Sequence, residues 1–205
     1  EFTKSFAFRM KTDSEKKLTR NSGFYDRTSK LTRNFIDARG FWLPNDYTKH
    51  GSVNEYNACR NDAVLILGLG GVGMSGLQLG KAVLKNPFFA ADIHDTKLKR
   101  ARMLGAKGVY NTTDNEALSR LKSETKGGVS AVIDFVGSHK TAEFALGSLK
   151  RGGKYIVVGL YGGALSIPMA TIPLRAISIV GSLTGSLSEA KDVMRLAKAG
   201  KIGSR

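Results

Sequence analysis

Short runs of apolar residues recur along the chain from residue 63 onward. The first run, Ala63–Leu67, is continuous, as expected for a strand buried on both faces of a parallel sheet. Further runs follow at 88–93, 131–135, 155–158 and 177–180. Helical spacing fills the intervals, at 72–84, 97–104, 115–121, 141–149 and 189–199. Strands that alternate with helices predict a parallel sheet with helices on both faces, which is a doubly wound α/β fold.

The segment 1–60 follows a different pattern. Its apolar residues are mostly aromatic, and of the β-branched aliphatic residues only Ile36 and Val53 occur. Because neither a helical nor a strand period persists, the segment buries too little surface to offset its ordering entropy. We expect an irregular, poorly ordered extension over 1–60 and a folded domain over 61–205. Two alternatives stay open for the extension: an aromatic platform for single-stranded nucleic acid, or an out-of-frame translation upstream of a genuine domain.

The charge balance is strongly basic, with 32 Lys and Arg against 17 Asp and Glu and a net charge of +15. Such a surplus is typical of proteins that neutralise nucleic-acid phosphates. The excess is nevertheless spread out, with 12 basic and 7 acidic residues in 1–60 and 20 and 10 in 61–205. Without a basic block, nucleic-acid binding is the weaker interpretation. No apolar run approaches the roughly 18 residues of a membrane span, so we expect no membrane partner.

Thiol, imidazole and terminal residues give no indication of a metal centre. Cys59 is the only cysteine, which excludes an intrachain disulfide and a zinc site built on several thiolates. Cys59 and the three histidines, His50, His94 and His139, are not spaced as metal ligands are. We therefore predict no metal ligand and no catalytic residue in this chain. The chain begins at Glu1 without a signal pattern, from which we expect a cytoplasmic protein given as a fragment or an incomplete gene model.

The sequence GLGGVG at 68–73 has the G-x-G-x-x-G spacing between the first strand and the first helix. Gly68 permits a tight turn, Gly70 lets the backbone approach a pyrophosphate, and Gly73 lets the helix pack closely on the strand. At the helix start, Gly71 and Val72 present unpaired N–H groups to an anion. Among 24 glycines such spacing is weak evidence alone, but its place between strand and helix makes it a dinucleotide-binding signature, typical of a Rossmann fold.

An acidic residue completes this signature. Asp92 ends the second apolar run, 19 residues after Gly73, where a carboxylate accepts hydrogen bonds from ribose hydroxyls and repels a 2′-phosphate. The alternative is a surface aspartate that caps the next helix. Lys97 is ambiguous, since it could reach the ribose, tolerate a 2′-phosphate, or belong to a solvated face with Lys99 and Arg100. We predict NAD as the cofactor, with NADP as the weaker alternative.

From Ala63 to Ile202 the chain resembles the coenzyme domain of the medium-chain dehydrogenase/reductase family, especially its zinc-dependent alcohol dehydrogenases. The glycine loop and the acidic residue suit this branch better than the quinone reductases. The matching stretches are VLILGLGGVG (64–73), LQLGKA (77–82), DIHDTK (92–97), LGA (104–106), VIDFVG (132–137), GGKYIVVG (152–159) and VGS (180–182).

This resemblance implies roles for particular residues. The loop 70–73 would hold the pyrophosphate, Asp92 with Lys97 the adenosine ribose, and Ile93 the adenine. Three residues would line the adenosine side of the cleft: Phe135, Val136 and Gly137. The backbone groups of three others would orient the nicotinamide: Val158, Gly159 and Leu160. The segment 182–184 would approach the carboxamide. For Phe135, Val136 and Val158, plain core packing is the alternative.

The resemblance further implies the coenzyme-binding portion of an NAD-dependent alcohol dehydrogenase, which transfers hydride between an alcohol and NAD. The family's catalytic zinc polarises the alcohol oxygen, but no ligands for it stand in this chain, so we expect NAD(H) binding without alcohol turnover. Family dimers pair through sheet edges, which implies a homo-oligomer through the strand at 177–180. The alternative functions are a non-catalytic NAD-binding or dimerisation module and a basic nucleic-acid-binding protein.

Overall fold

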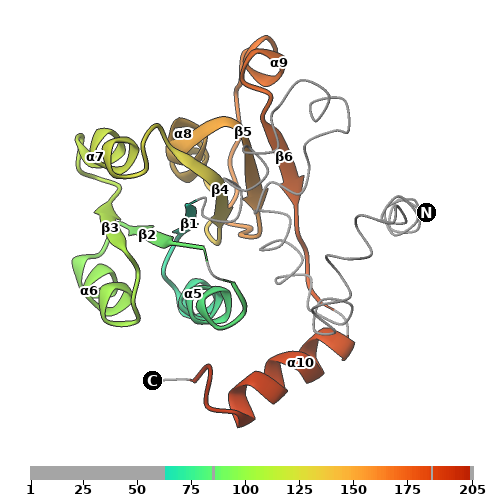
Figure 1. Cartoon of the computed structure of the whole chain (residues 1–205). Coiled ribbons are helices and arrows are strands. Elements are labelled where there is room, and N and C mark those ends of the chain that lie inside the picture. Colours follow the sequence, from blue (N-terminus) through green and yellow to red (C-terminus); the bar gives the residue numbers. More distant parts are fainter. Residues whose placement is uncertain (1–62, 85, 186, 204–205) are drawn as a thin grey trace, which may run out of the picture.

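A computed structural model describes residues 63–84, 86–185 and 187–203 of the chain (Figure 1). They form a six-stranded parallel sheet in the order β3-β2-β1-β4-β5-β6. The strands are β1 Val64–Leu67, β2 Phe88–Asp92, β3 Gly108–Asn111, β4 Val129–Asp134, β5 Leu149–Val157 and β6 Ser178–Gly181. The strand order reverses between β1 and β4, as in doubly wound Rossmann folds, and the predicted fold class is confirmed. The predicted extension 1–60 lies outside the described residues.

Helices cover both faces of the sheet (Figure 1). They are α5 Gly71–Val83, α6 Asp95–Met103, α7 Ala117–Glu124, α8 His139–Ser148, α9 Thr171–Arg175 and α10 Leu187–Lys198. Figure 1 shows α5 and α6 on one side of the sheet, with α7 and α8 on the other. None of the helices in the described part of the chain is long and apolar enough to cross a membrane.

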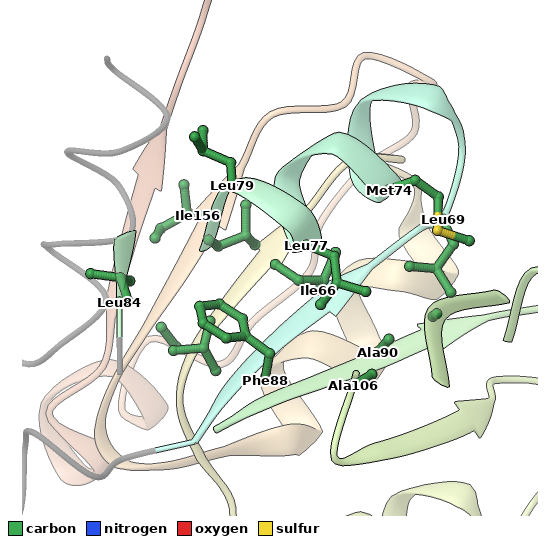
Figure 2. Packing of buried hydrophobic residues seen from close by; sticks show 14 of the residues in the cluster. Ile66, Leu69, Met74, Leu77, Leu79, Leu84, Phe88, Ala90, Ala106 and Ile156 are labelled. Carbon is green, nitrogen blue, oxygen red and sulfur yellow. The ribbon is translucent and has the colours of Figure 1, made fainter. Parts of the chain in front are cut away.

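The side chains of each strand divide between two apolar clusters because successive residues of a strand point to opposite faces. On the α5 side, Ile66 and Phe88 of the sheet pack with Leu77 of α5 (Figure 2). On the α7 and α8 side, Leu65 and Phe89 pack in the second cluster. Burying each such side chain contributes roughly 1.5–3 kcal/mol. Burial on both faces explains why the inner strands appear in the sequence as continuous apolar runs.

The structure adds two elements that the apolar pattern did not predict, β3 and α9. Within β3 only Val109 and Tyr110 are apolar, and burial alternates along the strand, so no continuous run marks it. Strand β5 also begins at Leu149, earlier than the predicted 155. The apolar pattern missed its first residues because they include the exposed Arg151 and Gly152.

Candidate functional site

The loops that follow β1 and β4 lie where the strand order reverses, which is the usual place for ligands in open α/β sheets, and the loops after β2 and β5 flank them. The first loop starts at Gly68, whose φ of 84° is in the left-handed region and whose N–H donates to Ala91 O over 2.9 Å. A Cβ on Gly73 would lie 1.8 Å from Gly68 O. These two glycines are therefore required by the packing of the chain itself.

The two glycines between them have a different environment. A Cβ added to Gly70 or to Gly71 would meet no atom within 4 Å, and Gly70 has an ordinary φ of −72°. The fold itself therefore accepts a larger residue at both positions, and the missing side chains leave room for another molecule against the loop. The start of α5 has no side-chain cap and no acidic residue in its first turn. Its unpaired amides and positive dipole end suit a pyrophosphate.

Asp92 connects this loop to the end of β2. Its Oδ2 accepts from Leu69 N at 2.6 Å, and its Oδ1 accepts from His94 N at 3.0 Å. Asp92 is only 7% exposed, and the N-cap position of α6 belongs to His94. The alternative of a surface aspartate capping the helix is therefore wrong. The carboxylate therefore holds the glycine loop.

Two further predicted residues lie beside Asp92. Lys97 forms an ion pair with it, with 3.5 Å between Lys97 Nζ and Asp92 Oδ1. Ile93 is 56% exposed, an apolar surface directly after the carboxylate. Lys99 and Arg100 are exposed on α6. The structure thus gathers the glycine loop, Asp92, Ile93 and Lys97 at the carboxyl ends of β1 and β2.

The loops after β4 and β5 lie against each other. A Cβ on Gly137 would be 2.1 Å from Gly159 O, and Tyr161 N donates to Val136 O over 3.0 Å. Leu160, which follows Gly159, is 82% exposed.

Two members of these loops, Phe135 and Val158, pack against the core. Phe135 lies under α5, where its ring would be 2.7 Å from a Cβ on Gly76, and Val158 packs against the same apolar cluster. Both residues therefore take part in core packing. The segment 182–184 follows β6 and is joined to β5 by Ser182 N, which donates to Val157 O over 2.8 Å.

Within the part of the chain that the structure describes, no group of three or more His, Cys, Asp and Glu residues could hold a metal ion. His139 is exposed and contacts Ala164 O through Nδ1 at 2.8 Å and Glu143 through Nε2 at 3.2 Å. Cys59 and His50 lie outside the described residues. The donor set of the described residues therefore does not fit zinc.

Analysis of the sequence assigned no role to Asp134 or Tyr155. Asp134 is completely buried at the end of β4, and Tyr155 O–H donates to its Oδ2 over 2.8 Å. The sequence did contain one signal for Asp134, because this residue lies within an apolar run. A charged residue in a buried strand needs a partner.

The family model described as zinc-binding dehydrogenase matches residues 71–199. An NAD-dependent alcohol dehydrogenase of Saccharolobus solfataricus is 34% identical over 157 residues, which cover 76% of this chain and 45% of the relative. An alcohol dehydrogenase of Geobacillus stearothermophilus is 36% identical over 155 residues, covering 76% and 45%. The chain thus spans less than half the length of these relatives.

Solved structures of dehydrogenases also match this chain. The crystal structure of the alcohol dehydrogenase from Aeropyrum pernix matches with a TM-score of 0.70 and 30% identity, covering 84% of this chain and 45% of that one. The D-arabinose dehydrogenase of Sulfolobus solfataricus matches with a TM-score of 0.68 and 25% identity, covering 86% and 50%.

Proposed function

Because this chain belongs to the zinc-binding dehydrogenase family, in the zinc-dependent alcohol dehydrogenase branch, we propose that residues 61–205 are the NAD-binding domain of an NAD-dependent alcohol dehydrogenase. Several relatives are alcohol dehydrogenases, two of them NAD-dependent, which supports NAD and an alcohol as the reactants. Bound NAD⁺ would supply the acceptor for a hydride from the alcohol carbon. The described residues would bind and orient it.

One observation carries this proposal: the Asp92 carboxylate holds the glycine loop through Leu69 N at 2.6 Å. The contact places a helix start without a cap, which favours phosphate, next to a carboxylate, which favours ribose hydroxyls. A 2′-phosphate in the same place would meet the negative charge of Asp92. We therefore propose NAD over NADP, with Lys97 assisting Asp92 at the ribose.

The remaining roles follow the same geometry. Gly70, Gly71, Val72 and Gly73 would hold the pyrophosphate, and Ile93 would pack on the adenine. The two loops after β4 and β5, at 135–137 and 158–160, would line the adenosine side and orient the nicotinamide. Support comes from their position at the reversal of strand order and from the mutual contact of Gly137 and Gly159.

We also propose that two copies of the chain pair through β6. This strand is the last of the sheet, and Ser178, Ile179 and Gly181 are exposed along it. An edge strand with unpaired backbone groups is a template for a second strand.

Titration calorimetry of the full chain with NADH and NADPH tests the cofactor proposal. The wild-type chain is expected to bind NADH more tightly than NADPH. Asp92→Asn removes the charge and one ribose acceptor, so NADH affinity should fall by about tenfold or more while the discrimination against NADPH shrinks.

The matched control is Glu116→Gln, which removes one negative charge from an exposed residue before α7. It should leave both affinities unchanged. A wild-type chain that binds NADPH as tightly as NADH would refute the NAD assignment, and one that binds neither would refute the proposed function.

A further inference from the structure

The carboxyl end of β4 contains a buried charged group that the proposed cofactor contacts do not use. Asp134 has no exposed surface, whereas Asp92 at the corresponding end of β2 is 7% exposed. A cofactor therefore has no access to Asp134. Burying a carboxylate costs several kcal/mol unless hydrogen bonds replace its water, so its partners indicate what this residue does.

The hydrogen-bond donors to Asp134 belong to the two cofactor loops or to β5, the strand that leads into one of them. Its Oδ1 accepts from Val136 N at 2.8 Å and from Gly137 N at 3.0 Å. Its backbone oxygen accepts from Val158 N at 2.9 Å and from Gly159 N at 3.0 Å. One residue thus fixes the backbone of both loops.

Tyr155 completes the arrangement from β5. Tyr155 is 1% exposed, and its phenol donates to Asp134 Oδ2 over 2.8 Å. Burial, followed by the charge and the hydrogen bond of Asp134, raises the pKa of Tyr155 above its ordinary value, so the phenol stays a donor. With this bond, both carboxylate oxygens are paired.

The two loops have little freedom to move separately. A Cβ on Gly159 would lie 2.1 Å from the carbonyl carbon of Val136, so the two backbones are in direct contact. Asp134 itself lies in β4, in register with Leu67 of β1 and Val157 of β5. Asp134 therefore extends from a central strand of the sheet and holds both loops at the carboxyl end of that strand.

We propose that Asp134 and Tyr155 are positioning residues that preorganise the loops 136–137 and 158–160 for the cofactor, without touching it. This inference rests on the proposed function of NAD(H) binding. A preformed loop spares the cofactor the entropy of ordering it, so loss of the pair should appear as weaker NADH binding.

The chain offers a matched control for the pair. Tyr110 is 2% exposed and donates to Glu124 Oε2 over 2.7 Å, which repeats the phenol–carboxylate contact between β3 and the end of α7. No predicted cofactor residue belongs to either element. A purely structural role for Tyr155 would therefore make Tyr155→Phe and Tyr110→Phe equivalent.

The test compares these two variants in the full chain by NADH fluorescence titration and by thermal melting. Both substitutions are expected to lower the melting temperature. Tyr155→Phe should also weaken NADH binding by about tenfold, while Tyr110→Phe should leave it unchanged. Asp134→Asn keeps an oxygen for the two loop amides and a nitrogen that can donate to Tyr155 Oη, so it should bind NADH within about threefold of wild type.

Hydrogen exchange of the free protein gives a second readout that needs no cofactor. The amides of Val136, Gly137, Val158 and Gly159 should exchange faster in Tyr155→Phe and at the wild-type rate in Tyr110→Phe. A wild-type chain and a Tyr155→Phe variant that bind NADH equally tightly would overturn the positioning role alone. A wild-type chain that binds no NADH would overturn the proposed function as well.

Discussion

At the scale of single residues, the glycine loop separates what the fold needs from what a ligand needs. A Cβ on Gly73 would overlap Gly68 O at 1.8 Å, so an alanine there would disturb the protein itself. A Cβ on Gly70 or Gly71 meets nothing within 4 Å. Glycine at those two positions has no explanation in the packing of the described chain. A molecule lying against the loop would provide one.

Replacement of Gly70 by alanine tests this distinction. Its φ of −72° is accessible to alanine, so the free energy of unfolding should change by no more than about 1 kcal/mol. The new methyl group would occupy the space of the pyrophosphate, so NADH affinity should fall by about tenfold or more. Calorimetry and urea unfolding measure the two effects separately.

Gly203→Ala is the control, because a Cβ at Gly203 also meets no atom within 4 Å and the residue is remote in sequence from the loop. It should leave both quantities at their wild-type values. Unchanged NADH affinity in Gly70→Ala would mean that the loop does not carry the pyrophosphate.

At the scale of elements, continuous burial made the inner strands β1, β2 and β4 predictable from the sequence. The runs of β1 and β2 are apolar because each strand is buried along its whole length, and this feature is readable from residue types alone. Strand β3 alternates between buried and half-buried residues at the sheet edge, so the same criterion missed it.

The candidate site was predictable to a similar extent. The spacing between the glycine loop and Asp92 is local enough to read from the sequence. The pairing of Asp134 with Tyr155 was not, because it depends on the register of β4 against β5, which sequence periodicity does not determine. The contact of Gly137 with Gly159 depends on that register too.

The exposed edge of β6 leads to a prediction for oligomerisation. A lysine is a common natural device against edge-to-edge strand pairing, and Ile179 is 40% exposed on this strand. The wild-type chain should therefore be a dimer in size-exclusion chromatography with light scattering, and Ile179→Lys should be a monomer. Met103→Lys adds the same charge to an 81% exposed residue of α6 and should remain dimeric. A monomeric wild-type chain, or a dimeric Ile179→Lys variant, would contradict pairing through β6.

At the scale of the whole molecule, two buried tyrosines connect global stability to pH. Burial together with Glu124 raises the pKa of Tyr110, and burial together with Asp134 raises that of Tyr155. Each phenol starts from a usual pKa of 10.0, which approximates its value in the unfolded chain. The folded protein therefore keeps two protons that the unfolded chain releases once the pH exceeds about 10.

The direction of the resulting pH dependence follows from proton linkage. Where the unfolded chain binds fewer protons than the folded one, the free energy of unfolding falls as pH rises. Each tyrosine should lower the free energy of unfolding by about 1.4 kcal/mol per pH unit above pH 10, and by nothing well below that pH.

Urea unfolding between pH 8 and about pH 11 should give a shallower alkaline slope for Tyr155→Phe than for wild type. Tyr161→Phe is the control, because Tyr161 is 82% exposed and should leave the slope unchanged. Comparing slopes between variants cancels the titration of the lysines, which all variants share. Equal slopes for Tyr155→Phe and wild type would therefore show that the Tyr155 phenol does not retain its proton in the folded state.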